Sequence, residues 1–295
     1  MNRFQPGILA AVPAAARHLH FALAPGATAT DVARALAALA ERADGDAVVV
    51  GLGESLIAAL GRAIPGLHDF PAHDGAVRIP ATPAAAWCWL RGDDRGELLH
   101  RARGLAAALT PALRLDDELE TFRYANSLDL TGYEDGTENP QGQEAVAAAF
   151  ADGLGAGLDG GSIAALQVWR HDLDRFAAMP AARQDSTFGR RKADNKEIND
   201  APASAHVKRT AQESFEPPAF VLRRSMPWAD CGEAGLVFLA FGRDAGAFEA
   251  LLRRMTGQED GIVDALFNFT QPRSGAYFWC PPLLDGRLDL SALGV

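Results

Sequence analysis

The sequence predicts an α+β protein made of two ferredoxin-like domains with antiparallel sheets, of the dimeric α+β barrel type, at residues 1–125 and 126–295. The order strand, helix, strand, strand, helix, strand occurs twice along the chain. A chain of 295 residues with 48% hydrophobic content can bury one large core or two smaller ones. A dinucleotide-binding fold is not expected, because the only similar segment, GLGES at Gly51, lacks the third glycine and is better explained as a tight turn from strand to helix.

In the first half, short apolar segments that end at glycine or proline predict strands, and Ala-rich amphipathic segments predict helices. In chain order, we expect a strand at 18–26, a helix at 29–44, a buried strand at 46–53, a strand at 84–92, a helix at 96–109 and an extended segment at 118–124.

The second half repeats this order around a long polar insertion at 182–216. Alternation of apolar side chains is clearest in SIAALQVWRH, residues 162–171, which predicts a strand. A short helix at 172–180, strands at 219–226 and 234–242, a helix at 245–255 and a last strand at 275–280 follow.

Composition excludes several classes of function. A net charge of −10 argues against binding to nucleic acids and to anionic membranes. No apolar segment is long enough to span a membrane, and Pro6 and Pro13 interrupt the N-terminal apolar stretch, which we interpret as mature protein and not as a signal peptide. The three scattered cysteines suggest neither a disulfide framework nor a thiolate metal site, so a cytoplasmic protein is expected.

The stretch GYEDGTENP, Gly132 to Pro140, places Glu134 and Asp135 side by side between glycines. Asp-Gly and Asn-Pro are ordinary turn sequences, so a simple turn acid is one interpretation of Asp135. An EF-hand calcium loop is excluded, because Pro140 stands where the glycine is required and Val146 where the closing glutamate is required. Turn chemistry alone leaves the two acids beside Tyr133 unexplained.

The seven histidines form neither HxxxH nor HExxH, so a histidine metal cluster is not expected. His171, at the start of a predicted helix, is assigned a solvated or structural role. His206 in SAHVKRT differs, because it follows the polar insertion and lies between the apolar residues Ala205 and Val207. It is either a surface or buried structural residue or a ligand.

Two adjacent arginines, Arg223 and Arg224, lie in the otherwise apolar segment VLRRSMPW. Side chains alternate along a strand, so one of the two faces inward or toward a cavity. A buried guanidinium needs an anionic partner. An exposed edge strand would explain only one of them.

Five segments occur in order: GYEDGTENP, QDSTFGRRK, SAHVKRT, LRRSMPW and NFTQPRSGAYFWCPP. Together they resemble the dye-decolorising peroxidases, particularly the B-type branch, and the likeness extends over most of the chain from Phe4. The resemblance implies a haem b in the C-terminal half. It implies an activity in which hydrogen peroxide is reduced via a ferryl intermediate while dyes, phenolic compounds or Mn²⁺ are oxidised in one-electron steps.

The resemblance also implies roles for individual residues. By position, His206 is the proximal iron ligand and Asp264 accepts a hydrogen bond from its imidazole. Asp135 is the distal acid-base residue and Arg223 the distal arginine, which should lower the pKa of Asp135 and keep it ionised in mildly acidic solution. Ser225 stands where some members carry asparagine, and Arg190 is expected at a haem propionate.

Other consequences of the resemblance stay open at this point. Family members commonly self-associate, so a homo-oligomer is expected. The ending LDLSALGV is similar to the tails that load such enzymes into encapsulin shells, although a frayed C-terminus is the alternative. A haem-handling protein with little turnover, and a binding module without cofactor, are the competing functions. Aromatic residues are either electron relays or ordinary core: Trp87, Trp89, Trp169, Trp228, Trp279, Tyr124, Tyr133 and Tyr277.

Overall fold

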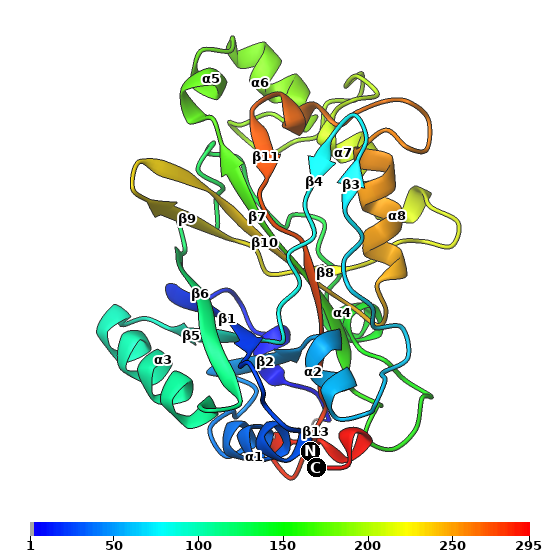
Figure 1. Ribbon diagram of the computed structural model, residues 1–295. Helices are drawn as coiled ribbons and strands as arrows, with labels where there is room; N and C mark the ends of the chain where they lie inside the picture. The colour runs from blue at the N-terminus through cyan, green and yellow to red at the C-terminus, as the bar shows by residue number, and fades with distance from the viewer. Residues whose placement is uncertain (1–2) are drawn as a thin grey trace.

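The computed structural model describes residues 3–295, and its central feature is one ten-stranded sheet with the strand order β6-β1-β5-β2-β12-β7-β10-β8 and with β9 and β11 beside β10 and β7. Strands β1, β2, β5 and β6 come from the first half of the chain and the others from the second (Figure 1). A single residue pair, Leu52 with Trp279, joins the two sets through β2 and β12. All the pairings are antiparallel.

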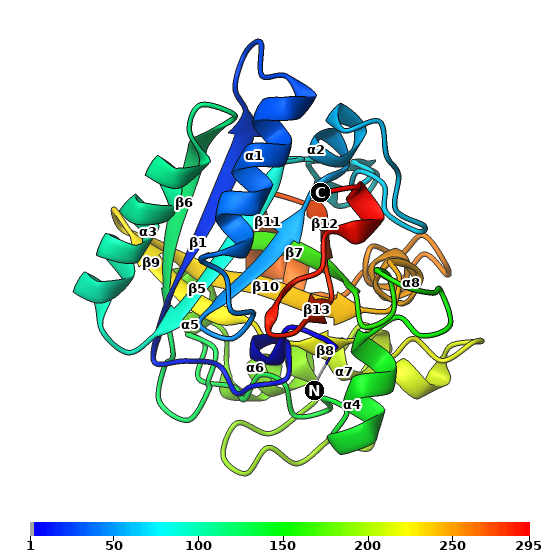
Figure 2. The same ribbon diagram turned by 90° about the horizontal axis from the view of Figure 1, so that it is seen from below.

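The first half folds into four long strands with two helices packed along them (Figure 2). Helix α1, Ala29–Ala40, begins at a capping box in which Thr28 and Asp31 bond each other's backbone N–H. Helix α3, Arg95–Leu109, begins at Asp94, whose carboxylate accepts two backbone N–H bonds. The remaining elements are η1 (Pro6–Ile8), β1 (Ala15–Leu23), β2 (Val48–Leu52), α2 (Glu54–Ala59), β3 (His73–Asp74), β4 (Arg78–Ile79), β5 (Ala86–Gly92) and β6 (Leu113–Phe122).

The second half places strands β7 and β10 at the centre, with helix α8 and several short helices around them (Figure 1). In chain order its elements are α4 (Gly142–Ala149), β7 (Ser162–His171), α5 (Leu173–Ala177), α6 (Ala181–Phe188), α7 (His206–Arg209), η2 (Gln212–Ser214), β8 (Leu222–Arg223), β9 (Met226–Asp230), β10 (Glu233–Gly242), α8 (Gly246–Met255), η3 (Ala265–Asn268), β11 (Thr270–Pro272), β12 (Ala276–Cys280), β13 (Leu283–Leu284), β14 (Arg287–Leu288) and η4 (Ser291–Leu293).

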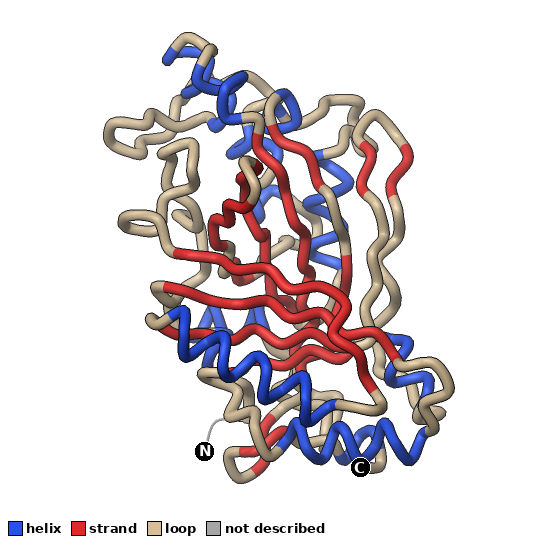
Figure 3. The backbone as a smooth tube through the Cα atoms, turned by 60° about the vertical axis from the view of Figure 1, so that its left-hand side comes forward, coloured by secondary structure: helices blue, strands red, loops and turns tan. Residues whose placement is uncertain are grey.

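The predicted α+β class is confirmed, and Figure 3 shows how the strands follow one another through both halves as one curved sheet. Within the described residues the sheet does not close into a barrel, because the end strands β6 and β8 share no hydrogen-bonded ladder. The strand predicted at 219–226 is wrong. Residues 222–223 form a two-residue strand, and the chain then turns into the separate strand β9. The division at residue 125 stays a prediction.

The C-terminal segment is packed, so the expectation of a frayed end is wrong. Leu288, Leu290 and Leu293 are buried in the same apolar core as the side chains of α1 and β2. This core and a second one between the two halves of the sheet hold most of the apolar side chains. No helix among residues 3–295 is both long enough and apolar enough to cross a membrane.

Candidate functional site

A cavity with about 990 Å³ of empty space lies in the second half between the sheet and helix α8. Gln167, Trp169 and His171 of β7 line it from the sheet side, because side chains at alternate positions share one face of a strand. Phe248, Leu251, Leu252 and Met255 form the helical wall.

His206 enters this cavity from the first position of the short helix α7. Its Nδ1 lies 2.7 Å from Oδ2 of Asp264, whose side chain is fully buried. A carboxylate can only accept, so Nδ1 carries the proton and Nε2 keeps its lone pair. Nε2 makes no hydrogen bond to any described residue and can bind a metal. The other oxygen of Asp264 accepts the backbone N–H of Leu266 at 2.9 Å, which fixes the carboxylate.

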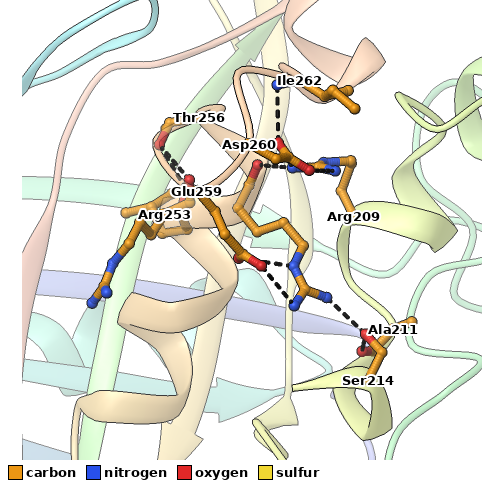
Figure 4. A network of polar contacts seen from close by, with 10 residues as sticks. Arg209, Ala211, Ser214, Arg253, Thr256, Glu259, Asp260 and Ile262 are labelled. Atoms are coloured by element: carbon orange, nitrogen blue, oxygen red, sulfur yellow. Dashed lines mark hydrogen bonds and ion pairs between the residues drawn. The ribbon is translucent and has the colours of Figure 1, made fainter. Parts of the chain in front are cut away.

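The helix that carries His206 is anchored at its other end by Arg209 (Figure 4). This buried guanidinium donates to both oxygens of Asp260 at 2.7 Å and to the carbonyl of Arg254 at 2.7 Å. Arg254 in turn pairs with Glu259 and bonds the hydroxyl of Ser214. A bidentate pair fixes direction as well as distance, so the network holds α7 against the end of α8.

The stretch GYEDGTENP contributes Glu134 and Asp135 to the cavity wall, and contacts of its other residues hold the turn in place. Gly132 and Gly136 have φ of +84° and +76°, which side chains rarely adopt. The Tyr133 ring stacks on Phe188 at 4.0 Å. Asn139 binds the backbone of Arg223 twice, accepting its N–H at 2.8 Å and donating to its carbonyl at 3.0 Å. The turn is therefore pinned to β8, which brings Asp135 and Arg223 to the same cavity.

Both acids of the turn, Glu134 and Asp135, line the cavity, but their surroundings differ. Glu134 is exposed and accepts the side-chain amide of Asn195 at 2.7 Å. Asp135 faces the cavity, where burial raises its pKa above the ordinary value. Arg223 lowers this pKa, as expected, and so does the N–H of Gly136, but burial outweighs them and Asp129 adds to the rise. The expected net lowering of the pKa of Asp135 by Arg223 is therefore wrong, because burial is the larger effect.

Arg223 and Arg224 diverge as alternation predicts. Arg223 lines the cavity, and its Nε is buried without a hydrogen-bond partner among the described residues. Arg224 points the other way and donates to the carbonyl of Leu9 at 2.6 Å. Burial, and next the charge of Arg91, lower the pKa of Arg224 to about 10.

Two further residues of the cavity wall were missed at the sequence level. His171 is not solvated: its Nε2 lies 3.0 Å from Oδ2 of Asp129, and its Nδ1 lies 2.6 Å from the hydroxyl of Thr270. Asp129 also accepts two bonds from Thr131. Despite burial, the hydrogen bonds from His171 and Thr131 hold the pKa of Asp129 below its ordinary value.

Two predicted residues lie outside this wall. The Ser225 hydroxyl accepts the N–H of Leu239 at 3.4 Å and does not line the cavity. Arg190 lies in an adjoining pocket, where it pairs with Glu138 and donates to the carbonyl of Asn195 at 3.0 Å. Its contact with a propionate stays a prediction.

Comparison with known proteins gives a consistent result. Residues 126–285, more than half of the chain, match the family described as Dyp-type peroxidase, C-terminal. The chain belongs to the Dyp-type peroxidase family. A dye-decolorizing peroxidase from Brevibacterium linens is 30% identical over 223 residues, which cover 73% of this chain and 61% of that protein. The match thus spans less than two thirds of this relative's length.

Solved structures of the family have the same fold. The encapsulated DyP-type peroxidase from Mycobacterium smegmatis superposes with a TM-score of 0.85 at 27% identity, covering 96% of both chains. A DypB variant from Rhodococcus jostii in complex with haem gives 0.81 at 26% identity, covering 92% of this chain and 93% of that one.

The residues of this cavity fit a haem. His206 offers one free imidazole nitrogen, the ligand that peroxidases use for haem iron. The apolar walls from β10 and α8 suit a flat porphyrin, and the unpartnered Nε of buried Arg223 leaves a donor for an anionic group. His206 and Arg223 are both cavity-lining, as is Asp135.

Proposed function

We propose that this protein is a haem peroxidase that reduces hydrogen peroxide and oxidises dyes or phenolic compounds in one-electron steps. The observation that carries the proposal is one cavity lined by three groups: an imidazole whose Nδ1–H is committed to a buried carboxylate, a second carboxylate, and a guanidinium. The haem, when bound, would supply an iron centre that exchanges electrons with peroxide and with the donor.

His206 would hold the iron through Nε2. Asp264, by accepting the Nδ1 proton at 2.7 Å, makes the imidazole a stronger electron donor and fixes the ring orientation. The cap bond from Leu266 keeps the carboxylate in place while it does so.

Asp135 would move a proton between the two oxygens of hydrogen peroxide. Its carboxylate takes the proton from one oxygen and returns it to the oxygen that leaves as water. The pKa raised by burial brings this carboxyl closer to the working pH, which favours transfer in both directions. Arg223, held by Asn139, supplies fixed positive charge where negative charge develops as the O–O bond breaks.

A stopped-flow experiment tests these roles. Asp135→Ala and Arg223→Ala should keep haem but react with hydrogen peroxide at least about a hundredfold more slowly. Glu144→Gln is the control, because this exposed acid in the first turn of α4 does not line the cavity, and it should react like the wild type. Wild-type rates in both alanine variants would refute the distal roles. A haem-loaded wild type that does not react with peroxide would favour a haem-handling protein.

The proposal also covers the electron donor, the encapsulin shell, the location and the oligomeric state. A DypB variant of similar structure is in complex with manganese, which makes Mn²⁺ a further candidate donor. However, the described residues contain no group of three or more histidines, cysteines or acids placed to hold a metal ion, so we favour organic donors. For an encapsulin shell, the leucines of the ending are already buried in this protein's own core, so we propose that this segment is structural. A cytoplasmic location and self-association complete the proposal.

A further inference from the structure

A second pocket, with about 710 Å³ of empty space, lies on the outer side of β11. It is bordered by the β3–β4 hairpin, the end of β7 and the start of α5, segments that meet at one end of the molecule (Figure 1). Three arginines, Arg78, Arg170 and Arg175, line it, together with one acid, Asp172. No role has been assigned to these residues above.

The positive charge of this pocket is only partly neutralised. Arg170 pairs with Glu233 at 3.0 Å, but its Nε is buried without a hydrogen-bond partner among the described residues. Arg78 pairs with Asp74 at 3.8 Å, whereas Arg175 forms no ion pair within 4.0 Å with any residue of 3–295. Asp172 accepts the backbone N–H of Arg175 at 2.9 Å. In a chain with a net charge of −10, such a local excess of arginines concentrates anions at one place.

An aromatic pair connects this pocket with the large cavity. Phe267 lines the outer pocket, and Trp169 lines the cavity. Their rings are stacked, with centroids 5.3 Å apart and an angle of 22° between the planes. Phe267 belongs to η3, and the strand that follows it, β11, pairs with the end of β7, where Pro272 lies opposite Trp169 and Gln271 opposite Arg170. An aromatic molecule held against Phe267 would therefore be two stacked rings away from the cavity.

We propose that this outer pocket binds anionic aromatic electron donors, with Arg170 and Arg175 holding a sulfonate or carboxylate and Phe267 contacting the ring. The proposal rests on the proposed function, since that activity supplies the oxidant. Two phenolic donors each lose one electron and one proton and become phenoxyl radicals. One hydrogen peroxide takes up the two electrons and two protons and becomes two water molecules.

Binding can be tested without turnover. A naphtholsulfonate and the parent naphthol form a matched pair of fluorescent probes, and each is titrated into haem-free and haem-loaded protein. The wild type should bind the sulfonate more tightly than the naphthol. Arg175→Glu should weaken sulfonate binding about fivefold and leave naphthol binding unchanged. Arg103→Glu, an exposed charge reversal on α3, is the control and should change neither.

Equal affinity for the two probes, or an equal loss in Arg103→Glu, would overturn the anion site. With haem and peroxide, Arg175→Glu should raise KM for the sulfonate alone, and Trp169→Phe should lower kcat for it at unchanged Kd. An unchanged kcat in Trp169→Phe would refute the aromatic connection. If the protein binds the sulfonate but never reacts with peroxide, the proposed function fails while the anion site stands.

Discussion

Replacing Asp264 with asparagine tests how the buried carboxylate controls the proposed iron ligand. The change keeps the size of the side chain and removes its charge. If the amide oxygen keeps the cap bond from Leu266, its NH₂ faces Nδ1 of His206, which must then act as acceptor. The imidazole proton moves to Nε2, the nitrogen that would bind iron. If the amide flips instead, its NH₂ faces the backbone N–H of Leu266, so that two hydrogen-bond donors meet.

Either outcome loses one charge-assisted hydrogen bond of 2.7 Å in a fully buried setting. Such bonds contribute about 1.5–3 kcal/mol, which corresponds to a haem affinity lowered about 10- to 100-fold. Titration of haem into the apoprotein, followed at the Soret band, measures this change, and the ferric spectrum reports the altered ligand.

Asp94→Asn is the control, because Asp94 caps α3 with the same type of backbone bond and contacts no histidine. This variant should bind haem like the wild type. If Asp264→Asn also has the wild-type affinity and ferric spectrum, the carboxylate does not govern His206 and the reasoning is refuted.

Two other predictions concern stability. Because burial raises the pKa of Asp135, the folded state binds its proton more tightly than the unfolded state, so stability is lost as pH rises from the ordinary pKa of 3.8 through the folded pKa. Haem-free Asp135→Asn should therefore melt at a higher temperature than the wild type at pH 7, by a margin that shrinks toward pH 4; a margin independent of pH would contradict this. Gly189→Ala places a Cβ 2.2 Å from Val207, beside His206, at a φ of +81°, and should lower the free energy of unfolding by about 2 kcal/mol or more in a denaturant titration. Gly61 has a φ of +68° and open space around it, so Gly61→Ala should lower the free energy of unfolding by only about 1 kcal/mol. An equal loss of stability in the two variants would contradict the contact of the added Cβ with Val207.

Local patterns predicted the regular elements well. The strand expected at 162–171 is β7, with the same limits, because a glycine precedes it and Asp172 caps the helix that follows it. The strand expected at 219–226 is reduced to Leu222–Arg223, and on its open edge Asn139 takes up both backbone groups of Arg223, so that β8 stays the end strand of the sheet. A contact 84 residues away in the chain leaves no local signal.

The site was predictable where its residues lie in recognisable segments. Asp135, His206, Arg223 and Asp264 all lie in segments that resemble a known family, and the structure gathers the first three around one cavity, with Asp264 directly behind His206. The contacts of His171 were missed because its partners, Asp129 and Thr270 of β11, lie 42 and 99 residues away in the chain.

The direction in which the pKa of Asp135 shifts was also not predictable from the sequence. The nearby arginine is visible there, but the extent of burial is decided by how the turn packs onto β8. Burial proved to be the larger effect.

The absorption spectrum of the haem-loaded wild type, before and after one equivalent of hydrogen peroxide, tests the central claim most directly. We predict a Soret band from histidine-ligated ferric haem that peroxide shifts at once and that two equivalents of a one-electron donor restore. A protein that takes up no haem, or whose Soret band peroxide leaves unchanged, would contradict the account.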